Sequence, residues 1–188
     1  MGLQPVFDGH NDILLRLQMA PAKREAIWLT GEGRGHLDLP RMQAGGFAGG
    51  MFAIYVPSPM DPGAPDYDAM MDNPPYEIEL PAMIPQQLAL PVAVQMAGHL
   101  MWMERASNGA FRLCRSVAEI EAAQAAGAIA GVMHMEGAEA IGPDLDALHG
   151  LCRKRPVRAV YCMPTLHNPL GWVMSMAQRE KLVAIARQ

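Results

Sequence analysis

His10 and Asp12 are the first residues whose types and spacing could do chemistry. They follow the short apolar run of residues 6–7, where a first β-strand would end and its loop begin. Side chains alternate along a strand with period two, so an imidazole and a carboxylate at these positions point the same way. Such a pair can bind a divalent metal, but zinc takes three or four ligands. Alone, the pair more commonly marks a surface turn with Asp12 as a helix cap.

Glu136 is the carboxylate that could complete such a metal site. It closes a second apolar run, residues 129–135. A carboxylate there must meet solvent, a cation or hydrogen-bond donors, because burying it unpaired is costly. A metal ligand and an ordinary solvated residue at the end of a strand fit Glu136 equally well. Glu139 fits the solvated reading better, and His134, two residues deeper, is expected in the core rather than on a metal.

His36 and Asp38 repeat the His-x-Asp spacing but have a simpler explanation. Pro40 follows in what would be the first helical turn, a pattern typical of an aspartate that caps a helix N-terminus. We therefore interpret this second pair as the start of a short helix that ends at glycines 45 and 46, and not as a ligand pair.

Segments of regular pattern must position these residues. Apolar runs predict a first strand at residues 6–7 and further strands at residues 51–56, 129–135 and 157–162. Helix signals include a clean stretch at 92–105, capping boxes at Ser116 and Ser175, and a cap at Asp144. Residues 57–75, rich in Pro, Gly and Asp, predict a long loop. Strands alternating with helices imply a parallel sheet, which carries its chemistry at the carboxyl ends of its strands.

The composition bounds the class of protein. With 188 residues, 51% hydrophobic and 18% charged, the chain should fold around a sizeable core. A net charge of -4 and scattered basic residues argue against a nucleic-acid partner. Neither a signal peptide nor a membrane span is recognisable, so we expect a cytoplasmic location. Three cysteines without CxxC spacing predict reduced thiols, and sixteen methionines predict flexible core filling.

Several segments, in this order along the chain, resemble the membrane (renal) dipeptidase family of zinc peptidases: residues 5–12, 36–41, 44–46, 55–57 and 135–141. The similarity covers about residues 4–150. That family has a TIM-like barrel that holds two zinc ions. The resemblance implies that His10 and Asp12 bind one zinc, and that Glu136 bridges the pair and takes part in catalysis. It also implies that a metal-activated hydroxide hydrolyses dipeptides, some with a D-residue at the C-terminal position.

The same resemblance implies ligands beyond Glu136, because the family takes two more zinc-binding histidines from later strands. His149 and His167 are the histidines that follow Glu136 here. We expect His149 on a helix surface, whereas His167 follows a strand, as does a substrate-contacting histidine of the family. A complete (β/α)₈ barrel takes about 250 residues. The expected fold class is therefore α/β, with parallel βα repeats resembling the N-terminal half of a TIM-like metallohydrolase barrel, incomplete.

Residues 152–188 resemble a different family, the pyridoxal-phosphate aminotransferases, through an Asn-Pro-x-Gly segment that begins at Asn168. No motif matches that family's Schiff-base lysine, and an ordinary Asn-Pro turn is the alternative. The expected organisation is a partial dipeptidase-like domain at 1–150 and a tail at 151–188, which could make the chain a chimera. The expected function is a zinc dipeptidase acting on a dipeptide. The alternatives are an inactive chain that self-associates, including as a homo-oligomer, and a pyridoxal-phosphate protein.

Overall fold

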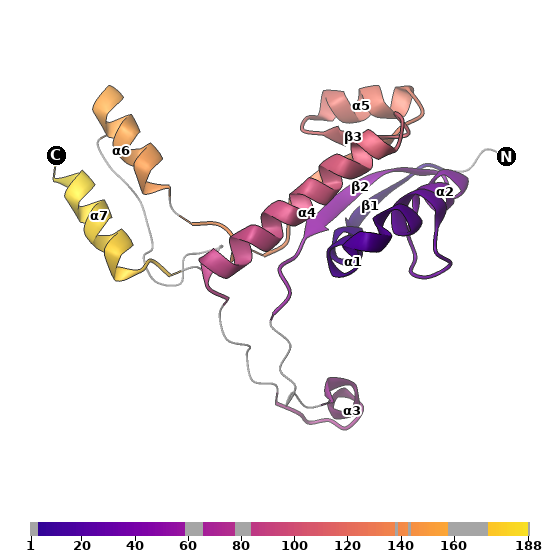
Figure 1. Cartoon of the computed structure of the whole chain (residues 1–188), viewed down its shortest axis with the longest axis horizontal. Helices are drawn as coiled ribbons and strands as arrows, with labels where there is room; N and C mark the ends of the chain where they lie inside the picture. Colours follow the sequence, from indigo (N-terminus) through magenta and orange to yellow (C-terminus); the bar gives the residue numbers. More distant parts are fainter. Residues whose placement is uncertain are drawn as a thin grey trace.

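Four parallel strands form the sheet that organises the molecule (Figure 1). The computed structural model describes residues 4–58, 66–77, 84–137, 139–142, 144–157 and 173–187. Within these residues the strands are β1 (Val6–Asn11), β2 (Phe47–Ile54), β3 (Phe111–Cys114) and β4 (Ile129–Met135), in the spatial order β1-β2-β4-β3. Since β1, β2 and β4 are neighbours and parallel, their carboxyl ends lie along one edge of the sheet.

Seven α-helices lie within the described residues. They are α1 (Ile13–Met19), α2 (Leu39–Ala44), α3 (Tyr67–Met71), α4 (Gln86–Ala106), α5 (Val117–Ala125), α6 (Leu145–Lys154) and α7 (Met176–Ala186). Of these, α1, α2, α4 and α5 contact the sheet. A 3₁₀ turn at Pro21–Lys23 and a π-helical turn at Ala26–Thr30 follow α1. None of the helices among the described residues has the length and apolar character needed to cross a membrane.

The main core lies where α1 and α4 pack on each other and on the sheet. Leu14 and Leu17 of α1 are fully buried there, as are Met96, Leu100 and Met103 of α4. The rings of Trp28, Phe52 and Phe111 meet edge to face in the same core. Methionines therefore do fill the core, as predicted, although Met101 on the outer face of α4 is exposed.

Glycine at position 49 lets three strands approach closely. A Cβ placed on Gly49 would lie 2.6 Å from the carbonyl oxygen of Ala130 on β4 and 2.6 Å from the Phe7 ring on β1. Any larger residue would force β2 away from its neighbours. The apolar run predicted a strand that starts at residue 51, whereas β2 begins at Phe47 and includes both glycines 49 and 50.

Helix α5 and the pair α6–α7 bury smaller clusters. Under α5 the Cys114 thiol is buried, and burial raises the pKa of that thiol. Cys114 and Cys152 form no disulfide among the described residues, and Cys162 lies outside them, so the reduced state stays a prediction. Helices α6 and α7 lie side by side away from the sheet (Figure 1) and share the buried residues Leu145, Met174 and Ile185. Lys181 of α7 lies 2.7 Å from Asp146 of α6, and this ammonium lowers the pKa of the Asp146 carboxyl.

Most predicted elements are present, with definite corrections. Strand β4 matches its predicted bounds, the helices capped by Asp144 and Ser175 are present, and Ser175 and Gln178 form the complete capping box. Ser116 caps α5, but Glu119 accepts from the N–H of Arg115, so that box is only half formed. The predicted loop at 57–75 contains α3, and neither α1 nor β3 was predicted. The strand expected at 157–162 lies almost wholly outside the described residues.

Candidate metal centre

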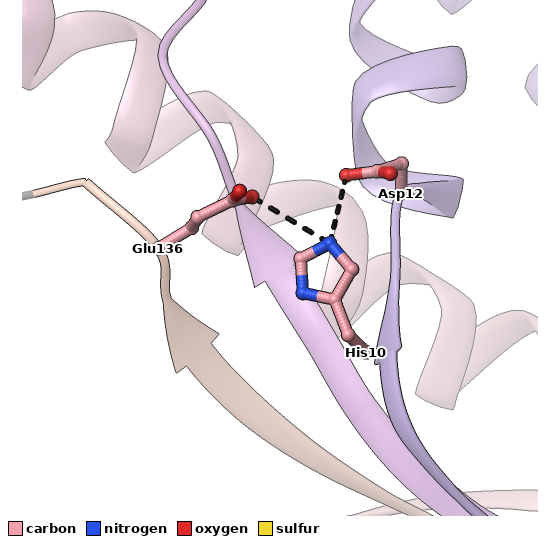
Figure 2. A group of neighbouring side chains, drawn as sticks. All are labelled: His10, Asp12 and Glu136. Atoms are coloured by element: carbon pink, nitrogen blue, oxygen red, sulfur yellow. Dashed lines mark ion pairs between the residues drawn. The ribbon is translucent and has the colours of Figure 1, made fainter.

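His10, Asp12 and Glu136 converge at the carboxyl edge of the sheet (Figure 2). The Nε2 atom of His10 lies 3.4 Å from Oδ1 of Asp12 and 3.7 Å from Oε2 of Glu136. One potential ligand atom from each residue can be chosen so that all three lie within 4.8 Å of one another. The structure thus brings together, from two strands far apart in the sequence, the three residues that the sequence analysis singled out.

Two strand ends and a helix start position these side chains. His10 stands near the end of β1, and Glu136 directly follows β4, where its N–H donates to the carbonyl oxygen of Ile54. Asp12 occupies the N-cap position of α1, yet its side chain accepts no capping hydrogen bond. Its carboxylate faces His10 instead (Figure 2). Helix capping therefore does not account for Asp12.

The geometry and chemistry of this group fit a divalent metal. Two ligand atoms that each lie about 2.1 Å from one tetrahedral zinc ion are about 3.4 Å apart, close to the separations around His10 Nε2. Imidazole nitrogen and carboxylate oxygen are both ordinary zinc ligands, and three protein ligands leave a coordination position for water or substrate. The side chains are 42%, 54% and 39% exposed, in the order His10, Asp12, Glu136, so solvent and substrate can reach them.

A hollow of about 630 Å³ adjoins His10 and Asp12. We call it the β1 hollow; its lining includes Val6, Asp8, His10, Asp12, His36 and Phe47. Its volume falls within the range of roughly 300–1,000 Å³ that is usual for small-molecule sites. Its lining combines polar and charged side chains with the apolar Val6 and Phe47, a mixture that such sites have.

The other candidate histidines and acids among the described residues do not belong to this ligand group. His134 is half-buried rather than a core residue, and its ring meets the His10 ring edge-on at 5.8 Å. Glu139 lies in a turn and has a buried carboxylate oxygen without a hydrogen-bond partner among the described residues. His149 is half-buried on α6. His167 and Asn168 lie outside the described residues.

The second pair behaves as the sequence predicted. Asp38 is 3% exposed and accepts a hydrogen bond from the N–H of Arg41, which makes it the N-cap of α2. The Arg41 side chain also donates to the same carboxylate. Gly31, at φ 75°, packs so closely on Asp38 that a Cβ there would lie 2.7 Å from its Oδ2 atom. Asp38 is therefore enclosed by the protein, while His36 is exposed.

Asp8 and Asn11 are the residues near this centre that sequence reasoning missed. Asn11 is 6% exposed and connects β1 to β2, and Asp8 accepts hydrogen bonds from both Asn11 and the backbone of His10. Asn11 is the middle residue of the His-x-Asp pair and Asp8 lies two residues before His10, which was the available signal. Sequence alone, however, does not distinguish a buried amide with a structural role from an ordinary loop residue.

An imidazole and two carboxylates at the ends of parallel strands are an arrangement also found in metal-binding proteins of α/β fold. Comparison with known proteins supports this class. The model of the membrane dipeptidase family, peptidase family M19, matches residues 1–179. The chain therefore belongs to this family.

Two solved metallopeptidase structures agree with that assignment, and one curated relative is also similar to the chain. The chain is 58% identical to the dipeptidase AC, a metallopeptidase of family M19, with a TM-score of 0.66 over 81% of this chain and 40% of that one. It is 52% identical to a metallopeptidase from Rhodobacter sphaeroides liganded with a phosphinate mimic of the dipeptide L-Ala-D-Ala, with a TM-score of 0.72 over 99% of this chain and 57% of that one. An uncharacterized protein in the PQQ-III 3′ region of Acinetobacter calcoaceticus is 35% identical over 155 residues, 75% of this chain and 44% of that protein.

These comparisons confirm the fold class and correct one expectation. The predicted α/β fold with parallel βα repeats, similar to a TIM-like metallohydrolase, is confirmed. The chain spans between 40% and 57% of the length of the relatives it matches. The family match runs on to residue 179, so the suggested chimera with an aminotransferase-like tail finds no support. The expected boundary near residue 150 stays a prediction.

Proposed function

We propose that this chain carries the metal-binding centre of a zinc-dependent dipeptidase. The observation that carries the proposal is the convergence of His10, Asp12 and Glu136 within 4.8 Å in a member of the membrane dipeptidase family. In this proposal His10 and Asp12 bind one zinc ion, and Glu136 is both a ligand and the catalytic carboxylate that bridges to a second ion.

The charges and positions of the three side chains suit these roles. Two carboxylates and a neutral imidazole carry two negative charges, which balance the charge of one zinc ion. Asp12 approaches His10 from the β1 side and Glu136 from the β4 side (Figure 2). The role of Glu136 as a bridge to a second ion is proposed from the family resemblance. When bound, zinc polarises the scissile carbonyl and supplies hydroxide near neutral pH by lowering the pKa of its water.

The β1 hollow is the proposed position of part of the dipeptide. It reaches from His10 and Asp12 to the apolar side chains of Val6 and Phe47. A dipeptide with a small side chain could lie along it with its peptide bond near His10. The Rhodobacter sphaeroides relative was solved with a mimic of L-Ala-D-Ala. We therefore propose dipeptides, including those with a C-terminal D-residue, as the substrate class, and His167 as a residue that contacts them.

Hydrolysis of a dipeptide panel by the purified, zinc-supplemented chain tests this function. We expect cleavage of L-Ala-D-Ala that is lost on chelation and absent in Glu136→Gln. His167→Ala should raise KM without changing zinc content. A chain that binds zinc but cleaves none of the panel would contradict the proposed activity. Size-exclusion chromatography alongside the assay tests the alternative of an inactive, self-associating chain, which would elute as a large species without activity.

The remaining expectations are tested separately. Incubation with pyridoxal phosphate should produce no cofactor absorbance band, because the dipeptidase family match extends into the tail as far as residue 179. A homo-oligomer and a cytoplasmic location stay predictions, which sedimentation and cell fractionation can check.

A further inference from the structure

Asn11, the last residue of β1, lies in the sequence between the proposed ligands His10 and Asp12, and its side chain is buried. Its Nδ2 atom donates to Oδ2 of Asp8 at 3.0 Å and to the carbonyl oxygen of Met51 on β2 at 3.1 Å. The other oxygen of Asp8 accepts from the backbone N–H of His10 at 3.3 Å. Asp8 thus connects the Asn11 amide to the backbone of the proposed ligand.

The two acceptors determine the orientation of the Asn11 amide. Rotating it by half a turn would place its oxygen against the carbonyl of Met51 and the carboxylate of Asp8, which are both acceptors. In the orientation observed, Oδ1 is buried and has no partner within the described part of the chain. A buried, unpaired carbonyl is costly, because it has lost its hydrogen bonds to water. The donor end of this amide must therefore contribute enough to offset that cost.

The hydrogen bonds of Asn11 span an irregular part of the sheet. Asp8 pairs with Gly50 and Asn11 with Phe52, so β1 advances three residues where β2 advances two. Such a bulge bends a strand and changes the direction of its side chains. The Asn11 amide holds this bulge to β2, while Asp8 holds the backbone of His10. Between Asp8 and Asn11, β1 has no regular pairing with β2, so these hydrogen bonds are what holds His10 in place beside Asp12.

We propose that Asn11 and Asp8 are positioning residues, which hold the β1 bulge so that the His10 imidazole faces Asp12 and Glu136. The inference rests on the proposed metal centre for its consequence, since the positioned group is a proposed ligand. Neither residue is a ligand itself. Partners that orient metal ligands typically change metal affinity about 10–100-fold when they are removed.

Three variants test the roles of Asn11 and Asp8. Asn11→Ala removes both donors without adding a charge. Asn11→Asp keeps the size but turns two donors into acceptors that face Met51 and Asp8. In the double variant Asp8→Asn/Asn11→Asp, the new amide at position 8 can again donate to position 11 and accept from the N–H of His10. The bond to Met51 stays broken, so this exchange should recover part of the loss.

Ser107→Ala is the matched control for a purely structural effect. Ser107 is also buried, and its hydroxyl accepts from Trp28 Nε1 at 2.8 Å and donates to the carbonyl oxygen of Met103 at 2.6 Å. This variant therefore loses buried hydrogen bonds in the main core, away from the metal centre. The wild type and all variants are compared while folded, as judged by circular dichroism and Tm.

Two readouts are measured on each folded protein: zinc affinity by competition with a chelator, and the His10 imidazole NMR signals without metal. We expect Asn11→Ala to weaken zinc binding about 10–100-fold and to shift the His10 signals, with Asn11→Asp worse and the double variant between them. Ser107→Ala should change neither. Wild-type affinity and unmoved His10 signals in Asn11→Ala would overturn the proposal. If the wild type binds no zinc while the His10 signals still move, the positioning role stands and the proposed function fails.

Discussion

The two His-x-Asp pairs have the same spacing and opposite surroundings. The pair at His10 and Asp12 is solvent-exposed, and a third potential ligand, Glu136, arrives from another strand. The pair at His36 and Asp38 has its carboxylate almost wholly buried, capping α2. Both aspartates occupy helix N-cap positions, but only Asp38 makes the capping bond with its side chain.

An aspartate that stands at a helix N-cap without making the capping bond indicates a metal ligand better than the His-x-Asp spacing does. A carboxylate at an N-cap normally accepts from the first-turn N–H groups, which stabilises the helix. Asp12 forgoes that interaction, and its carboxylate lies beside an imidazole and near a second carboxylate. This arrangement leaves the Asp12 carboxylate available to a cation. We therefore expect the two pairs to respond differently to the same substitutions.

The largest difference should appear in catalysis. His10→Ala and Glu136→Gln each remove a proposed ligand, so we expect dipeptide hydrolysis to fall at least ~100-fold, beyond the effect typical of residues that only support a ligand. His36→Ala should lose less activity than either of these variants, because His36 lines the β1 hollow but is not a proposed metal ligand. Steady-state rates of the three variants decide this. Equal losses in His10→Ala and His36→Ala would remove the distinction between the pairs.

The second difference concerns stabilisation by zinc. A ligand that binds only the folded state stabilises it by about 2.7 kcal/mol at a free concentration of 100 Kd. Zinc should therefore raise the Tm of the wild type and of Asp38→Ala, and EDTA should reverse the rise. His10→Ala should show little change in Tm on either addition. A zinc-dependent Tm that survives in His10→Ala would place the metal elsewhere.

The third difference concerns the helix cap. Asp38→Ala removes the cap of α2 and leaves Arg41 without its carboxylate partner. We expect a loss of about 0.5–2 kcal/mol in the free energy of unfolding, measured in denaturant. The control is Asp144→Ala, which removes the exposed cap of α6 and should cost less. Reduced zinc affinity in Asp38→Ala at unchanged stability would show that Asp38 contributes to metal binding and not only to the helix cap.

The smallest effect is expected for Asp12→Asn on helix stability. Because the Asp12 side chain makes no capping bond, the substitution should leave the stability of the metal-free protein within about 0.5 kcal/mol of the wild type. Relief of repulsion from Glu136 could even raise it slightly. A clear loss of metal-free stability would indicate that Asp12 caps α1 in solution.

The sequence was sufficient for the parts of this molecule that are set by local pattern. The continuous apolar run of β4 and the caps at Asp38, Asp144 and Ser175 act through neighbouring residues, so they were predicted correctly. Strand β3 was missed because its four residues include the exposed Arg112 and depend on pairing with β4.

The nonlocal features of the site were beyond local pattern. Helix α4 begins before Pro91, although a proline inside a helix costs about 3 kcal/mol, because its buried residues pack into the main core. The convergence of Glu136 with His10 depends on the spatial order of β1, β2 and β4, which the parallel-sheet prediction allowed but did not specify. The hydrogen bonds from Asn11 to Asp8 and Met51 depend on the irregular register between β1 and β2, which no residue pattern predicted.

The zinc content of the purified chain tests the central claim most directly. After dialysis against zinc-free buffer, we predict at least one tightly bound zinc ion per wild-type chain by elemental analysis. His10→Ala and Glu136→Ala should retain substantially less, whereas His36→Ala should match the wild type. Less than one zinc ion per wild-type chain, or equal zinc content in all four proteins, would contradict a metal centre formed by His10, Asp12 and Glu136.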